Sequence, residues 1–170
     1  VYGLAVLPQK AFSKKLYTLK NRATTKPFLV LADSIDQIKP HVVDLSDAFW
    51  KQLESLWPGA LSLILPTSPN SSLTKATSIG FRIPNHSMII SLLQRVGPLF
   101  VTSANISGQE EITDHREIEE AFGKDFPWLP GEPGNGLPST ILAYDGKSTR
   151  LIRKGVTSYE TLKQNFPSLE

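Results

Sequence analysis

The sequence of 170 residues contains no cysteine. Disulfide bonds and thiolate metal sites are therefore excluded, which fits a reducing compartment. Positive and negative charges nearly balance, with 18 Lys and Arg against 16 Asp and Glu, so any basic site must be local. No apolar run approaches the length of a membrane span, and no signal-peptide pattern opens the chain. We expect a cytoplasmic protein without membrane association.

The common catalytic motifs are also missing. The sequence has no Gly-x-Ser-x-Gly elbow, no Walker phosphate-binding loop and no strand-borne Gly-x-Gly-x-x-Gly. Its histidines, His41, His86 and His115, have no second His, Asp or Glu at ligand spacing on a shared helix face. We therefore expect no metal held by protein ligands, and we set aside the standard hydrolase and nucleotide-loop functions.

The length suits one domain with a full hydrophobic core, and we take residues 1–170 as that domain. Apolar runs predict strands at 1–5, 28–32, 61–65, 78–83, 98–101, 139–144 and 150–153. Amphipathic spacing predicts helices at 11–20, 34–39, 46–56, 87–96, 113–122 and 158–166. Strands that alternate with helices indicate an α/β fold with a largely buried sheet.

Two short segments carry the most chemical information. Lys20 and Arg22 supply positive charges at a helix end, whereas Ser103 and Asn105 supply a hydroxyl and an amide after a strand. Such groups suit a polyphosphate or another anion. Taken singly, each residue is more simply a solvated charge or a turn residue that bonds its own backbone. The functional interpretation depends on their joint occurrence.

Further cations and hydroxyls lie at predicted strand ends or in loops. In open α/β sheets, ligands bind outside the strand ends, so these residues extend the predicted anion site. They are Ser78, Arg82, Ser107, Thr140 and Arg153.

The order and spacing of the motifs resemble the YrdC/TsaC/Sua-type threonylcarbamoyl-adenylate synthases over essentially the whole chain. The motifs are Val1-Tyr2-Gly3-Leu4, Lys20-x-Arg22, Lys26-Pro27-Phe28, Trp57-Pro58-Gly59-Ala60-Leu61-Ser62, Phe81-Arg82-Ile83-Pro84-Asn85-His86, Ser103-Ala104-Asn105-x-Ser107-Gly108, Ser139-Thr140 and Leu151-Ile152-Arg153-Lys154-Gly155. The resemblance implies an open, twisted, mixed sheet flanked by helices, with a basic concave cavity.

The resemblance also implies a reaction. L-threonine and bicarbonate form N-carboxy-threonine, whose carbamate attacks the α-phosphate of ATP and releases pyrophosphate. The product is the activated intermediate for the threonylcarbamoyl-adenosine (t6A) modification of tRNA, which implies tRNA or a t6A-transfer protein as partners. Because a carbamate is already anionic, this step needs positioning and charge neutralisation more than a protein base. Mg²⁺ would accompany ATP, held mainly by phosphate oxygens.

By the same resemblance, site residues can be assigned by role. The catalytic residues are Lys20, Arg22, Ser103 and Asn105. The ATP-binding residues are Arg22, Lys26, Ser78, Val101, Ser103 and Arg153. The threonine-binding residues are Arg82 and Thr140, and the guanidinium of Arg82 suits a carboxylate because it can form two parallel hydrogen bonds.

The chain departs from the family pattern in several places. A Pro-Thr-Asp/Glu-Thr segment normally precedes Val-Tyr-Gly-Leu, so we expect that the first strand and a substrate-contacting threonine are missing, and that synthase activity is weakened if the chain is complete. Asn21 stands where the family has Gly, and Lys26 replaces a common Asn. Glu110 and Glu111 add negative charge, which we expect to alter nucleotide affinity.

Two other functions remain open. An RNA-binding module of the same fold without catalysis could use the same cations, but the small net charge and sparse aromatic residues favour the enzyme. The related carbamoyl-transfer module of hydrogenase maturation proteins ranks last, since those proteins carry a zinc finger and this chain has no cysteine.

Overall fold

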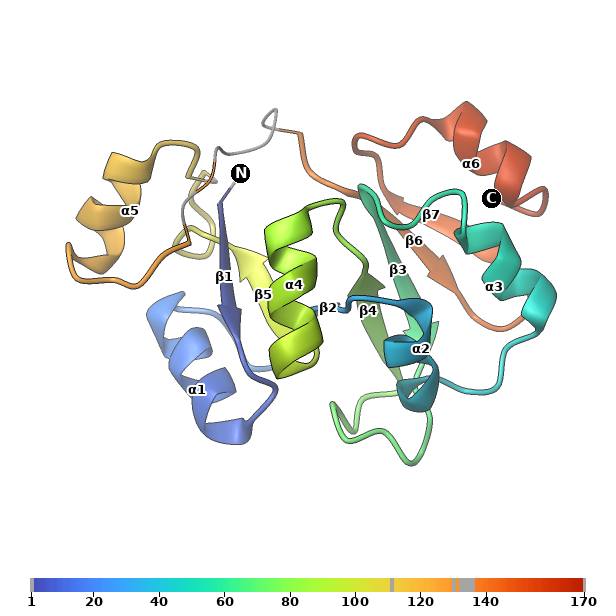
Figure 1. Cartoon of the computed structure of the whole chain (residues 1–170), viewed down its shortest axis with the longest axis horizontal. Helices are drawn as coiled ribbons and strands as arrows, with labels where there is room; N and C mark the ends of the chain where they lie inside the picture. Colours follow the sequence, from blue (N-terminus) through green and yellow to red (C-terminus); the bar gives the residue numbers. More distant parts are fainter. Residues whose placement is uncertain (1, 111, 130, 132–136, 170) are drawn as a thin grey trace.

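A computed structural model describes residues 2–110, 112–129, 131 and 137–169 (Figure 1). Strands and helices alternate along the described part, close to the predicted ranges. The strands are β1 (Gly3–Val6), β2 (Leu29–Leu31), β3 (Leu61–Pro66), β4 (Ser78–Arg82), β5 (Leu99–Ser103), β6 (Thr140–Tyr144) and β7 (Thr149–Arg153). The helices are α1 (Lys10–Leu19), α2 (Ile35–Ile38), α3 (Asp47–Leu53), α4 (Ser87–Val96), α5 (His115–Phe122) and α6 (Tyr159–Asn165), with a short 3₁₀ turn η1 (Lys39–His41) after α2.

The strands form one mixed sheet in the order β1-β5-β2-β4-β3-β6-β7. Two pairs are parallel, β2 with β4 and β3 with β6, and the other neighbours are antiparallel. The α/β architecture with an open, mixed sheet is therefore confirmed. β1 and β7 are the edge strands, so the two ends of the described chain lie toward opposite edges of the sheet (Figure 1).

Polar side chains begin most of the helices by accepting a hydrogen bond from a backbone N–H of the first turn. The Ser46 hydroxyl accepts from the Phe49 N–H at the start of α3, and the His86 ring accepts from the Ile89 N–H at the start of α4. The predicted start of the 113–122 helix was wrong by two residues. The carboxylate of Asp114 accepts from the Arg116 N–H at 2.8 Å, so α5 begins after Asp114.

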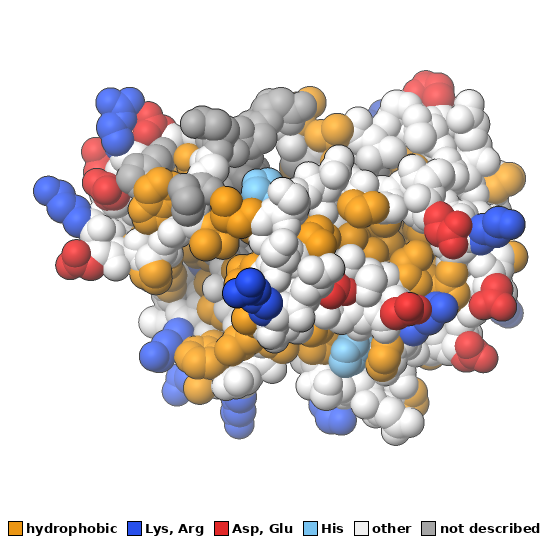
Figure 2. Space-filling model, viewed as in Figure 1, with side chains coloured by type: hydrophobic (Ala, Val, Ile, Leu, Met, Phe, Trp, Pro, Cys, Tyr) orange, Lys and Arg blue, Asp and Glu red, His pale blue; other side chains and the backbone are white. Residues whose placement is uncertain are grey.

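Successive side chains of each strand point alternately to a face that contacts the core and to an open face. Leu61, Leu63 and Leu65 of β3 are fully buried in the main core, together with Phe81 of β4 and Leu142 of β6. That core includes residues of α2, α3 and α6, and a second core beneath α1 and α5 is centred on Leu4 and Leu16. Figure 1 shows α2 and α4 in front of the sheet, and Figure 2 shows apolar side chains on this side of the molecule.

The opposite face of the sheet carries few buried side chains, so the expectation of a largely buried sheet was wrong. Leu29, Gly80 and Val101 on this open face are half-buried, and Ser78 is exposed. Neither hydrophobic core includes residues of the open face, so the helices cover only the other face of the sheet. The open face is where strand residues remain accessible to a ligand.

Strand β5 extends two residues beyond its predicted end. It pairs with β1 from Phe100 to Ser103, with Gly3 opposite Ser103, and this edge pairing keeps Thr102 and Ser103 extended. Residues 131–138, whose Gly and Pro content predicts neither a helix nor a strand, fall mostly outside the described residues. None of the helices in the described part has both the length and the apolar character that crossing a bilayer requires.

Truncating Phe81 should strongly destabilise the fold. Its ring is fully buried at the centre of the main core, so Phe81→Ala leaves a cavity and should lower the free energy of unfolding by about 3–5 kcal/mol. Phe12 is 36% exposed, and Phe12→Ala should cost less than about 1 kcal/mol. Urea denaturation of both variants measures the difference, and equal losses would contradict this assignment of the core.

Candidate functional site

The end of α1 places a lysine inside the protein. Asn21, just beyond the helix, has a φ of 49°, a left-handed conformation that commonly ends helices and that Asn tolerates better than most residues. The side chain of Lys20 is only 1% exposed, although lysine is rarely buried without partners.

The second predicted segment supplies partners for Lys20. Its Nζ donates to Asn105 Oδ1 at 2.7 Å and to the Ser103 carbonyl oxygen. The Lys20 carbonyl in turn accepts from the Ser107 N–H at 2.9 Å. Such acceptors are required, because a buried ammonium group without them would be costly. The two segments lie together in the fold, as the sequence predicted, and we call Lys20, Ser103 and Asn105 the lysine cluster.

The amide of Asn105 is fixed on both sides. Oδ1 accepts from Lys20 and from the Ser103 hydroxyl, which lies 2.8 Å away. Nδ2 donates to the Gln109 carbonyl oxygen at 2.7 Å. Because Oδ1 meets only donors and Nδ2 meets an acceptor, the amide has one satisfied orientation. The lysine cluster is therefore a pre-formed group with its positive charge held in place.

Arg22 does not join the lysine cluster by any hydrogen bond found in the structure. Its Nη2 donates to the Pro27 carbonyl at 3.0 Å, and its Nε lies 3.4 Å from the Lys26 carbonyl. The guanidinium carbon also lies 5.6 Å from the centre of the Phe28 ring, within cation–π range. Arg22 therefore lies against the loop that follows α1, while Lys26 is exposed on that loop.

The strand register shows that Arg82 and Ser103 lie in different rows of residues across the open face. Leu31 of β2 lies opposite both Arg82 and Leu99, so Arg82 is level with Leu99, four residues before Ser103 on β5. Five predicted site residues are the first or last residues of strands, namely Ser78, Arg82, Ser103, Thr140 and Arg153. Val101 lies within β5, Asn105 lies two residues beyond its end, and Lys20, Arg22 and Lys26 lie outside the strands.

A second polar group lies at the level of Arg82. Ser62 of β3, Ile141 of β6 and Arg153 of β7 continue the same row across the sheet. The Ser62 and Ser139 hydroxyl oxygens are 2.8 Å apart, and Arg153 donates through Nε and Nη2 to the Ser139 carbonyl at 3.2 and 2.9 Å. We call Arg82, Arg153, Ser62 and Ser139 the arginine cluster.

Both guanidinium groups are held by neutral acceptors. Arg82 Nε donates to the Gly59 carbonyl at 2.9 Å, and in the described part of the chain no carboxylate pairs with Arg82 or Arg153. Burial lowers the pKa of Arg82 from its ordinary value, and the positive charge of Arg153 lowers it further. The arginine cluster is therefore a site of uncompensated positive charge, suited to an anion.

Gly59 holds its carbonyl toward Arg82 through a tight backbone turn. Its N–H donates to the Ile83 carbonyl at 2.8 Å, and a Cβ at this position would lie 2.3 Å from the Leu56 carbonyl oxygen. The sequence interpretation assigned this segment only to ending a helix and packing Trp57. It missed Gly59, Ser62 and Ser139, although Ser62 interrupts the apolar run of β3 with a hydroxyl on the open face.

The remaining predicted residues have different surroundings. The Thr140 side chain is fully buried, and its hydroxyl donates to the Thr157 carbonyl at 3.0 Å and accepts from the Thr157 N–H at 3.1 Å. Ser78 lies at the other end of β4 from Arg82. Val101 lies between the clusters, in a half-buried strip with Leu29 and Gly80.

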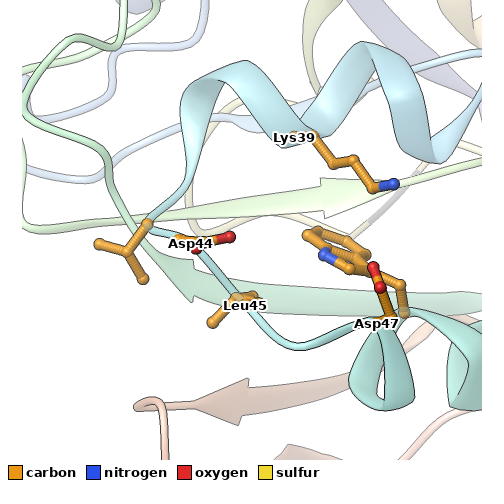
Figure 3. Close-up of a pocket in the computed structure, with 6 residues that line it drawn as sticks. Lys39, Asp44, Leu45 and Asp47 are labelled. Carbon is orange, nitrogen blue, oxygen red and sulfur yellow. The ribbon is translucent and has the colours of Figure 1, made fainter.

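Two hollows mark the surface away from these clusters. One, of about 460 Å³, lies beside Ser78 and has Ile64, Ala143, Arg150 and Ile152 among its lining residues. The other, of about 160 Å³, is lined by Lys39, Asp44, Leu45 and Asp47 near the start of α3 (Figure 3). Lys20, Arg82 and Arg153 line neither hollow, so the expected basic concave cavity stays a prediction.

No group of three or more His, Asp or Glu residues in the described part is arranged to hold a metal ion. The structural features that could bind substrate are therefore the lysine cluster, the arginine cluster and the strip between them. All three lie on the open face or at its edge.

Comparisons with known proteins agree with this architecture. A family profile, Sua5_yciO_yrdC, described as "Telomere recombination", matches residues 1–155. Proteins named threonylcarbamoyl-AMP synthase from Buchnera aphidicola and Escherichia coli are 38% and 33% identical, over 89% and 91% of this chain and 92% and 85% of their own length.

Solved structures share the fold. The crystal structure of P. abyssi Sua5 complexed with L-threonine matches with a TM-score of 0.88 at 23% identity, covering 100% of this chain and 53% of that one. This chain thus spans about half the length of that protein. E. coli YciO matches with a TM-score of 0.75 at 18% identity, over 94% of this chain and 81% of that one. The chain belongs to the Sua5/YciO/YrdC family.

Proposed function

We propose that this chain is a threonylcarbamoyl-AMP synthase, which makes threonylcarbamoyl-AMP and pyrophosphate from L-threonine, bicarbonate and ATP. The names of relatives at 33–38% identity support the activity. The single structural observation that carries the proposal is the buried Lys20, fixed by Asn105 and Ser103 at the edge of the open face.

The lysine cluster suits the chemical step. A carbamate oxygen of N-carboxy-threonine forms a bond to the α-phosphorus of ATP, while the bond from that phosphorus to the bridging oxygen breaks and pyrophosphate leaves with the electron pair. Negative charge moves toward the leaving group, so a fixed cation and oriented hydrogen-bond donors stabilise the transition state. Lys20, Arg22, Ser103 and Asn105 take this role in the proposal.

The arginine cluster suits the anionic ends of the substrates. Arg82 meets the threonine carboxylate through its planar guanidinium, and Arg153 meets the nucleotide. Between the two clusters lies the half-buried strip of Val101, Leu29 and Gly80. A ligand pair with negative charge at both ends and a less polar middle matches that arrangement.

Other residues take supporting roles in the proposal. Lys26, Ser78 and Val101 line the nucleotide, and Mg²⁺ enters with ATP, coordinated by its phosphate oxygens. Thr140 contributes to the threonine site through the backbone position that its bonds to Thr157 maintain. The product is passed to tRNA, directly or through a t6A-transfer protein, in the cytoplasm.

Removing the charge of Lys20 should abolish most of the activity. Lys20→Met keeps the side-chain length, and Asn105→Ala removes the acceptor that fixes the ammonium group. Each should lower kcat/KM for threonine-dependent pyrophosphate release about 100-fold, because preorganised charge is lost from the transition state. Lys14→Met, on an exposed position of the same helix, is the matched control and should leave kcat/KM within about two-fold.

The assay is run with each amino acid in turn, on this chain and on a form extended at its N-terminus by the Pro-Thr-Asp-Thr pattern. No preference for threonine in either form, or full activity of Lys20→Met, would overturn the proposal. RNA retention that falls steeply with salt, without pyrophosphate release, would favour the RNA-binding module instead.

Arg82→Lys should weaken threonine binding selectively. Lysine keeps the charge but cannot donate two parallel hydrogen bonds, so the KM for threonine should rise about ten-fold while the KM for ATP changes little. Arg95→Lys, on the exposed surface of α4, is the control. Steady-state kinetics with each substrate varied in turn provide the measurement, and a rise confined to the KM for ATP would contradict the assignment of Arg82.

A further inference from the structure

A chain of hydrogen bonds lies beneath Arg153. The guanidinium Nε and Nη2 donate to the Ser139 carbonyl, and Nη2 also lies 3.4 Å from the Ser139 hydroxyl oxygen. That hydroxyl is 2.8 Å from the Ser62 hydroxyl. Three side chains, from β3, from β7 and from the residue before β6, are thus connected in series between the accessible Arg153 and the buried Ser62.

Ser62 has a position that core packing does not explain. Its neighbours Leu61 and Leu63 face the main core, whereas Ser62 points to the open face and is nevertheless fully buried. Its one hydrogen-bond partner among the described residues is the Ser139 hydroxyl. A buried hydroxyl on an otherwise apolar strand costs free energy unless that bond is made.

The guanidinium fixes the direction of donation at one end of this chain. Arginine has five N–H donors and no acceptor, so the Ser139 hydroxyl oxygen can only accept from Arg153. The bond between the Ser139 and Ser62 hydroxyls can have either oxygen as its donor, and in both cases it holds the Ser139 side chain in place. Ser62 therefore fixes the rotation of the Ser139 side chain, and Ser139 fixes Nε and Nη2 of Arg153. Nη1 of Arg153 has no partner among the described residues.

We propose that Ser62 is a positioning residue for nucleotide binding, which acts through Ser139 to hold the Arg153 guanidinium toward the phosphates or ribose of ATP. The inference rests on the proposed function, because Arg153 meets the nucleotide there. Ser62 does not touch the substrate. It keeps an arginine that lacks a carboxylate partner in one orientation before ATP arrives, which reduces the entropy lost on binding.

Ser62→Ala removes the terminal hydroxyl of the chain. The KM and the dissociation constant for ATP should each rise about five-fold, as expected for one lost orienting hydrogen bond. The kcat and the KM for threonine should stay within about two-fold of the wild-type values. Steady-state kinetics and equilibrium ATP binding, measured separately, give the split between ATP affinity and turnover.

Two further variants test the connection through Ser139. Ser139→Ala removes the intermediate hydroxyl but keeps the carbonyl that binds Arg153, and it should raise the dissociation constant for ATP by a similar factor. Ser62→Ala in the Ser139→Ala background should add almost nothing, because the two side chains act in series. Ser62→Thr, which retains a hydroxyl, should recover most of the ATP affinity.

Ser71→Ala is the matched control for the loss of a buried hydroxyl. Ser71 is 2% exposed, and its hydroxyl accepts from the Leu73 N–H and lies 3.5 Å from His41 Nδ1. It bonds no residue of the arginine cluster, so this variant should lose stability without losing ATP affinity. The inference is overturned if Ser62→Ala binds ATP as the wild type does, or if its effects match those of Ser71→Ala. It is also overturned if the effects of Ser62→Ala and Ser139→Ala add fully.

If Ser62→Ala does not fold, Ser139→Ala alone decides, and unchanged ATP affinity in that variant overturns the inference. Failure of the proposed function has a different signature. A wild-type chain that binds ATP without threonine-dependent pyrophosphate release removes the synthase proposal, while the ATP dissociation constants still test Ser62. A wild-type chain that does not bind ATP overturns both.

Discussion

The burial of the Lys20 ammonium group is the constraint on which the site and its surroundings depend. An ammonium group in a protein interior is tolerated only where oxygen acceptors replace water, and Asn105 and Ser103 provide them. To reach those acceptors, α1 must end at Leu19, and β5 must extend to Ser103 by pairing with β1. One charged side chain therefore connects the end of a helix, the last residue of a strand and the loop beyond it.

One face of the sheet packs against the hydrophobic cores, and the other face carries the polar side chains of the candidate site. Alternation along each strand sends leucine and phenylalanine side chains into the cores and sends Ser62, Arg82 and Arg153 to the open face. The two arginines are held by backbone and hydroxyl oxygens, which orient a guanidinium without neutralising it. Their charge remains available to a substrate, an arrangement that a carboxylate partner would have removed.

Local patterns were sufficient to predict the elements and their order, because caps and periodicity act within a few residues. The helix predicted at 113–122 instead begins after Asp114, which caps it. The complementary chemistry of the Lys20 and Asn105 segments indicated a joint site, and the family resemblance supported it. Strand order and register were beyond prediction, since they depend on pairing between distant segments. For that reason the sequence could not show that Arg82 and Ser103 lie at different levels, or that Ser62 lies beneath Arg153.

The neutral acceptors around Arg82 and Arg153 have a consequence for the folded state as a whole. Burial lowers the pKa of Arg82, and repulsion by the nearby guanidinium of Arg153 lowers it further. An anion that binds there removes the repulsion and selectively stabilises the native protein, by an amount that grows with the logarithm of its concentration.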